Sequence, residues 1–167
     1  MFSYLFKFKW IVLLLVLPSG LQAQTIQISE AVPQVKFIDQ HGSPHLIGAD
    51  SRLLIYSHSK NTGSMMAEIL ADVKTGHMHN IQAAYIADIS GMPSLISRFI
   101  ALPKMRDIPS PILVSREADQ VAWIPKKEDK LTLIFTQKGK VSDIIYSNDE
   151  EEIRALLKTS PSKKDKK

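Results

Sequence analysis

Apolar residues gather in short blocks along this chain, and two of the blocks are nearly uninterrupted. RLLIYSH, residues 52–58, and IQAAYIADI, residues 81–89, are typical of strands that are buried on both faces. PILVS, residues 111–115, predicts a third and shorter strand. A helix from Thr62 or Ser64 to Lys74 is indicated by apolar residues at helical spacing, namely Met65, Ile69, Leu70 and Val73.

Two further stretches predict helices. NDEEEIRALLK, residues 148–158, has an Asn or Asp cap, acids in its first turn and a lysine at its end, as the helix macrodipole favours. SLISRFIALPKM, residues 94–105, should be helical until Pro103 limits it. Its helical spacing runs through Leu95, Ile96, Phe99 and Ile100, and we expect most of its apolar positions to cover the sheet.

Hairpin patterns stand at both ends of this array. VKFIDQHGSPHLI, residues 35–47, surrounds a turn with Gly and Pro, and KLTLIFTQKGKVSDIIYS, residues 130–147, is joined at Lys138 and Gly139. VAWIP, residues 121–125, predicts a short extended piece. The resulting order is hairpin, strand, helix, strand, helix, strand, hairpin and helix. It predicts one α/β domain over residues 24–157, with a parallel sheet segment flanked by helices and antiparallel edges.

The first 23 residues have the layout of a secretory signal peptide. Lys7 and Lys9 precede an apolar run from Trp10 to Leu17, and a helix-breaking segment leads to Ala23. We expect cleavage after Ala23 and a periplasmic protein. The alternative is an uncleaved membrane anchor, but the apolar run is shorter than the roughly 20 residues that span a bilayer.

The formal net charge of +4 at pH 7 belongs to the ends of the chain. Residues 158–167 hold five lysines against Asp165, and two more lysines lie in the predicted signal peptide. The body of the domain is therefore slightly acidic, which gives no indication of nucleic-acid binding. We expect residues 158–167 to form a disordered basic tail, with weak contact to an anionic membrane surface as its alternative role.

The chain contains no cysteine. Disulfides are common in oxidising compartments, so an exported domain without them must obtain its stability from packing. Thiol–disulfide exchange by this chain is excluded, because that chemistry needs a thiolate.

The order of elements resembles the thioredoxin-like fold, in particular its peroxiredoxin and thiol-disulfide reductase branch. FIDQHGSPHLI resembles the opening hairpin of that branch, and LTLIFTQKGKVSDIIYSNDEEEIRALL resembles its closing hairpin and helix. YIADISGMPSLISRFIALPKMRDIPSPILVSREAD resembles a group of small exported proteins of Gram-negative bacteria that lack the Cys-x-x-Cys motif. Some members of this group carry an automatic label of FAD/FMN-containing dehydrogenase.

The resemblance places Thr62 where the fold has its nucleophilic cysteine and Met65 where it has the resolving partner. Lys130 and Leu131 stand where the fold has its cis-proline. We interpret Thr62 and Met65 as vestigial redox-turn positions. The flavin label has little support in the sequence, because the seven glycines are scattered and no G-x-G-x-x-G follows a strand.

GHMHN, residues 76–80, offers the best indication of a metal site. Imidazole and thioether are suitable ligands for copper, so His77 and His79 could hold it. His58 follows the strand at the other end of the predicted helix, about 15–18 Å away by the 1.5 Å rise per residue. This separation argues against one shared site.

Serine, threonine and histidine also cluster at the strand-to-helix turn, in SHSKNTGS, residues 57–64. A serine nucleophile beside His58 can be drawn there. Such residues more often cap a helix, and Asn61, Thr62 or Ser64 could satisfy its first amides. We therefore interpret the cluster as a capped helix start and assign no catalytic residue.

GMPSLISRFIALPKMRD, residues 91–107, combines apolar and basic side chains between stiff proline connections. We expect a partner surface there, formed by Met92, Phe99, Met105 and Arg106. The leading hypothesis is a redox-inactive periplasmic protein that binds another envelope protein or a small ligand. A copper or flavin carrier is the alternative, and an enzyme comes third.

Overall fold

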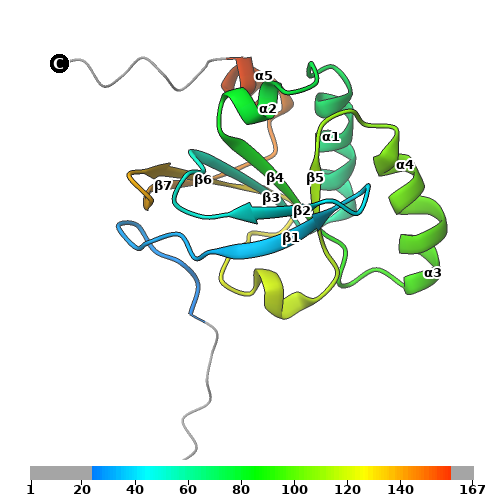
Figure 1. Ribbon diagram of the computed structural model, residues 1–167, viewed down its shortest axis with the longest axis horizontal. Coiled ribbons are helices and arrows are strands. Elements are labelled where there is room, and N and C mark those ends of the chain that lie inside the picture. Colours follow the sequence, from blue (N-terminus) through cyan, green and yellow to red (C-terminus); the bar gives the residue numbers. More distant parts are fainter. Residues whose placement is uncertain (1–23, 159–167) are drawn as a thin grey trace, which may run out of the picture.

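The computed structural model describes residues 24–158, which form a mixed seven-stranded sheet with helices against it (Figure 1). The strands are β1 (Val35–Asp39), β2 (Pro44–Ile47), β3 (Leu53–Ser57), β4 (Ala83–Asp88), β5 (Ile112–Ser115), β6 (Leu131–Gln137) and β7 (Lys140–Ser147). The α-helices are α1 (Lys60–Ala71), α2 (His77–Asn80), α3 (Ser94–Ile96), α4 (Leu102–Arg106) and α5 (Glu150–Lys158). A π-helical segment, η1 (Ser97–Ala101), joins α3 to α4, and η2 (Ala118–Val121) is a 3₁₀-helix.

The strand order in the sheet is β2-β1-β5-β4-β3-β6-β7. β3, β4 and β5 are parallel, whereas β6 pairs antiparallel with β3 and β1 pairs antiparallel with β5. The predicted mixed sheet with a hairpin at each end is confirmed. Because three neighbouring strands are parallel, their carboxyl ends at Ser57, Asp88 and Ser115 lie along one edge, which we call the carboxyl edge.

One face of the sheet carries the larger hydrophobic core. α1 packs there through Met66, Ile69 and Leu70, and α5 packs beside it through Ile153 and Leu157. Every residue of β3 is buried, as its uninterrupted apolar sequence predicts. This packing holds α1 against the sheet, beside the carboxyl edge.

The other face is covered by irregular chain, and the β1–β2 hairpin extends the sheet beside β5 (Figure 1). Phe37 of β1 and Ile47 of β2 share a second core with Leu54, Ile86 and Ile134 of the sheet. Val121 of η2 and Ile124 close the remainder of this core. The two cores together provide the packing that a chain without disulfides needs.

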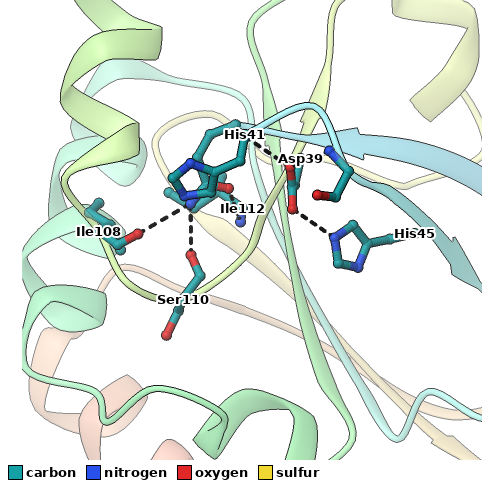
Figure 2. Close-up of polar contacts among 8 residues, drawn as sticks. Asp39, His41, His45, Ile108, Ser110 and Ile112 are labelled. Atoms are coloured by element: carbon teal, nitrogen blue, oxygen red, sulfur yellow. Dashed lines mark hydrogen bonds and ion pairs between the residues drawn. The ribbon is translucent and has the colours of Figure 1, made fainter.

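The tip of the β1–β2 hairpin is attached to the segment before β5 by the buried amide of Gln40. Its Nε2 donates to the carbonyl oxygens of Ile108 (3.3 Å) and Ser110 (2.9 Å), and its Oε1 accepts from the Ile112 N–H at 2.7 Å. These partners are drawn in Figure 2. Pro109 and Pro111 supply no N–H of their own, so one side chain satisfies the backbone where the β-ladder has ended.

The elements expected at residues 94–105 and 121–125 differ from the structure. The helix of residues 94–106 continues through Pro103, because the π-helical segment before it changes the hydrogen-bond pattern where the missing proline N–H would have been needed. Residues 121–125 are not extended. The Ala122 and Ile124 N–H groups bond to carbonyls three residues earlier, which makes a turn after η2.

The predicted signal peptide lies outside the described residues, as does the predicted basic tail beyond Lys158. Among residues 24–158, none of the helices has the length and hydrophobicity that crossing a membrane requires.

Candidate functional site

The carboxyl edge of the sheet is the candidate site, because α1 begins there directly after β3. Ser59 caps the helix: its Oγ accepts from the Thr62 N–H at 3.3 Å, while its extended backbone ends the strand. Capping by Asn61, Thr62 or Ser64 is therefore wrong, and the helix begins at Lys60. Ser59 is suited to this role because its hydroxyl reaches the Thr62 N–H, the last amide of the first turn that lacks a helical partner.

Ser57 and Tyr85 meet beneath this first turn. The Ser57 Oγ and the Tyr85 hydroxyl are 2.7 Å apart, and both residues are buried. Burial raises the pKa of Tyr85 to about 12, although the hydrogen bond with Ser57 works in the opposite direction. A Cβ at Gly63 would lie 4.0 Å from the Ser57 Oγ, so the helix passes directly above it. The pair is a neutral, closed contact with no base beside it.

The two residues at the redox-turn positions take part in hydrogen bonding and packing. Thr62 is buried, and its hydroxyl donates to the Ser59 carbonyl oxygen at 3.2 Å. Met65 is partly buried and packs against the larger core. Leu131, at the position of the missing cis-proline, is fully buried. This turn holds no exposed nucleophile among the side chains named here.

On the other side of the carboxyl edge, His58 stacks on Tyr56 with ring centroids 5.8 Å apart and an interplanar angle of 13°. The Tyr56 hydroxyl donates to Asp88 Oδ2 at 2.8 Å, and the Ser90 N–H donates to Asp88 Oδ1. Burial and the neighbouring Asp88 raise the pKa of Tyr56. The carboxylate of Asp88 is thus satisfied by two donors and fixes the end of β4.

His58 is the histidine of this edge. Burial lowers its pKa below the ordinary 6.5, and the charge of Lys126 lowers it further, whereas Asp88 and Asp129 act in the opposite direction. Its Nδ1 is buried and has no hydrogen-bond partner among the described residues. The neutral imidazole is therefore favoured, but no serine or threonine hydroxyl described above bonds to it.

The most conspicuous surface beside this edge is apolar and belongs to α3 and η1. Leu95 is 70% exposed, Phe99 65%, Ile100 51% and Ile96 44%. We call these four residues the Leu95 face. The expectation that most apolar positions of this helix cover the sheet is wrong for these four, whereas Leu102, one turn later, is buried in the core. Figure 1 shows α3 and α4 at the margin of the molecule, beyond α1.

The four residues of the predicted partner surface have different surroundings. Phe99 belongs to the Leu95 face, and its ring lies 5.6 Å from the Arg98 guanidinium carbon, within cation–π distance. Met92 and Met105 are half-buried and pack against the larger core. The Arg106 Nε donates to the Gln40 carbonyl oxygen at 3.0 Å, which ties α4 to the hairpin tip.

The histidines of GHMHN are in α2, at the opposite end of α1 from the carboxyl edge. His77 Nε2 lies 2.6 Å from the Leu157 carbonyl oxygen, and His79 is exposed. Copper binding by this pair stays a prediction. The part of the chain that the structure describes contains no cluster of three or more His, Cys, Asp or Glu side chains suited to a metal ion.

Sequence reasoning missed the polar contacts of Tyr56, Asp88 and Gln40. Asp88 and Ser57 could have been placed at the carboxyl edge from the parallel order of the strands alone, since both residues end predicted strands. Gln40 gives no such signal, because a glutamine beside a turn is ordinary in any sequence.

No protein-family model matches the chain, and a search of curated proteins finds no similar sequence. Solved structures do match. A candidate protein disulfide isomerase from Bacteroides thetaiotaomicron aligns with a TM-score of 0.54 and 19% identity, over 80% of this chain and 87% of that one. Peroxidoxin BcpB from Mycobacterium tuberculosis aligns with a TM-score of 0.50 and 14% identity, over 80% and 97%.

A third match is the pneumococcal exposed lipoprotein thioredoxin Etrx1 from Streptococcus pneumoniae, with a TM-score of 0.50 and 12% identity over 75% of this chain and 98% of that one. At these identities the likeness concerns the fold. The chain therefore has a thioredoxin-like α/β fold, as the resemblance in its sequence implied, and it has no cysteine.

Proposed function

We propose that this chain is an exported, redox-inactive thioredoxin-like protein that binds a protein partner through the Leu95 face. The observation that carries the proposal is the exposure of Leu95, Ile96, Phe99 and Ile100 on consecutive turns of one helix. Contiguous exposed apolar side chains of this size are typical of interaction sites in soluble proteins.

The other amphipathic helix of the fold shows that this exposure is specific to α3 and η1. In α5, Ile153 and Leu157 are buried. Glu151, Glu152 and Lys158 are exposed, and Glu150 is half-buried. The Leu95 face is therefore not a feature that every helix in this domain shares.

The charge around the Leu95 face indicates the chemistry of the partner. From Ser90 to Arg106 the sequence contains three basic residues, Arg98, Lys104 and Arg106, and no acidic residue. An apolar cleft with an acidic rim on another protein would complement this surface, because opposite charges at a rim steer association and reject wrong partners.

Redox inactivity supports binding as the role of the fold. Ser57, Thr62 and Met65 are all committed to packing or hydrogen bonds beside the carboxyl edge, and no thiolate can form in a chain without cysteine. Export is supported by the signal-peptide layout of residues 1–23, with Gln24 as the expected first residue of the mature protein.

Site-specific photocrosslinking in the native cell envelope tests the proposal. A photoreactive phenylalanine at Leu95 or Ile100 should capture one protein, whereas the same probe at the exposed positions Glu68 and Ser142 should not. The captured protein is then purified and its affinity for this chain is measured by calorimetry. Leu95→Ser with Phe99→Ser should weaken binding by at least about 10-fold, and Glu68→Ala should leave it unchanged.

Three results would contradict the proposal. Capture that is equal at the control positions would mean that the Leu95 face is not special. A crosslinked product of twice the chain's own mass would indicate self-association. The chain could bind anionic lipid vesicles and no purified protein, and Leu95→Ser could abolish the vesicle binding. That result would assign the Leu95 face to a membrane surface.

A further inference from the structure

A cavity of about 550 Å³ lies at the end of the molecule opposite the carboxyl edge. Its walls come from β2 and the loop after it, from the start of α2, from the first residues of β4 and from the prolines before β5. The volume is within the range of small-molecule sites, which is about 300–1,000 Å³.

The walls of this cavity are largely apolar. Ala84 of β4 and Leu113 of β5, which share one face of the sheet, line it, and Pro109 and Pro111 contribute flat, rigid surfaces. Leu46 of β2 also lines it and is 68% exposed. An apolar ligand in the cavity would cover this side chain, which otherwise remains in water.

His45 is the best-oriented polar group of the lining. Its Nε2 lies 2.8 Å from Asp39 Oδ2, and Figure 2 shows the second ring nitrogen on the side away from Asp39. Asp39 is buried, and its Oδ1 accepts from the N–H groups of His41 and Ser43. The carboxylate thus has a complete set of donors and holds the imidazole in one orientation, which leaves Nδ1 for a ligand.

The ionic state of Asp39 is consistent with this role. Burial alone would raise its pKa, but the hydrogen bonds from His45, Ser43 and His41 outweigh burial, and the net pKa is lowered. A second imidazole, that of the exposed His79, lines the same cavity from α2. Asp50 is the acidic side chain of the lining, and it is exposed.

We propose that this cavity binds a small aromatic carboxylic acid, with the ring against Ala84 and Leu113 and the carboxylate at Nδ1 of His45. A protonated His45 would bridge two carboxylates, that of Asp39 at Nε2 and that of the ligand at Nδ1. Binding therefore requires a proton on this imidazole, and the carboxylate of Asp50 opposes the ligand's charge.

The test uses two probes of nearly equal shape, indole-3-acetate and its neutral analogue tryptophol, with the purified protein and calorimetry or ligand-observed NMR. At about pH 6 indole-3-acetate should bind at least about 5-fold more tightly than tryptophol, and the ratio should approach one near pH 8. His45→Gln should abolish the preference, since a glutamine can still donate to Asp39 but offers no protonated ring nitrogen.

Filling the cavity separates it from the Leu95 face. Ala84→Phe, and Thr75→Trp from the exposed lining loop, should abolish binding of both probes, while Leu95→Ser with Phe99→Ser should leave it intact. The second filling variant changes an exposed residue, so the test survives if Ala84→Phe does not fold. The proposal is overturned if neither probe binds saturably below about 10 mM, if His45→Gln keeps the preference, or if only the Leu95-face variant removes binding.

Discussion

The side-chain oxygen of Gln40 accepts the N–H of Ile112 at 2.7 Å across a separation of 72 residues. This bond and the two that the same amide donates hold the hairpin tip against the segment before β5. All three partners are backbone groups, so no other side chain has to adapt for Gln40 to anchor them.

Replacing Gln40 by leucine should lower the free energy of unfolding by about 2–4 kcal/mol, because buried backbone groups lose their partner. Gln40→Glu keeps the acceptor for Ile112 but turns a carboxylate oxygen toward the carbonyls of Ile108 and Ser110. The pKa of this glutamate should be raised in the folded state. The destabilisation of the variant should therefore grow as the pH rises above the pKa that the glutamate has in the unfolded chain. Urea unfolding at several pH values measures both. Equal stability of Gln40→Leu and the wild type would show that solvent satisfies these groups.

Tyr85→Phe should destabilise the protein by about 1–2 kcal/mol, because the buried Ser57 hydroxyl then has no partner in the pair. Ser57→Ala should have a similar effect, since it removes the hydrogen-bond partner of the buried Tyr85 hydroxyl. The double variant should cost less than the sum of the two, with a coupling energy of about 1 kcal/mol in a double-mutant cycle. Strict additivity would mean that the 2.7 Å contact contributes nothing to stability.

The pKa of His58 should lie below 6.5 in an NMR titration of its ring proton. Lys126→Ala should raise it, and Asp129→Asn should lower it further, because these charges act in opposite directions on the imidazolium. The two variants are matched controls for each other. Shifts of the same sign in both would contradict a direct charge effect.

The stability of the fold should depend on the same group. Because the folded state resists protonation of His58, acidification below 6.5 places a proton on the unfolded chain first, and the free energy of unfolding falls in that window. His58→Gln should flatten this part of the stability curve, measured by urea unfolding at successive pH values. A slope unchanged by the substitution would assign it to other groups.

Gly139→Ala should destabilise the protein by about 1–3 kcal/mol, because Gly139 has a φ of +75° and an added Cβ would lie 2.9 Å from that of Ala49. Gly42→Ala, with a φ of +94° and open space around the new atom, isolates the effect of conformation alone. Gly91→Ala has neither problem and should be neutral or slightly stabilising. Thermal unfolding of the three variants should rank them in this order.

The sheet could be predicted from the sequence because its strands are strongly patterned. The uninterrupted run at β3 allowed no exposed face, and the acids at the start of α5 marked its direction. Asp149 also caps that helix as predicted, with its Oδ1 accepting from the Glu151 and Glu152 N–H groups. In these elements local preference and tertiary packing favour the same structure.

The candidate site was less predictable, for physical reasons. Between residues 94 and 106 apolar side chains occur on both sides of the helix, so periodicity alone could not indicate that Leu102, Met92 and Met105 face the core while Leu95 and Phe99 face solvent. A π-helical turn changes the angular step per residue, and this changes which side chains share a face. The contact between His45 and Asp39 depends on the register between β1 and β2, which no spacing rule specifies.

The two edge strands of the sheet, β2 and β7, also affect aggregation of the protein at high concentration. β2 has only four residues and begins with Pro44, which offers no N–H to a new neighbour. At the other margin, residues before β1 already occupy the start of β7: the Ser29 N–H donates to the Val141 carbonyl oxygen, and Ala31 bridges Lys140. The short β2 and the start of β7 are thus poor templates for strand addition by another molecule. In a fold that has no disulfide to keep it closed, these two features disfavour open-ended aggregation through those positions.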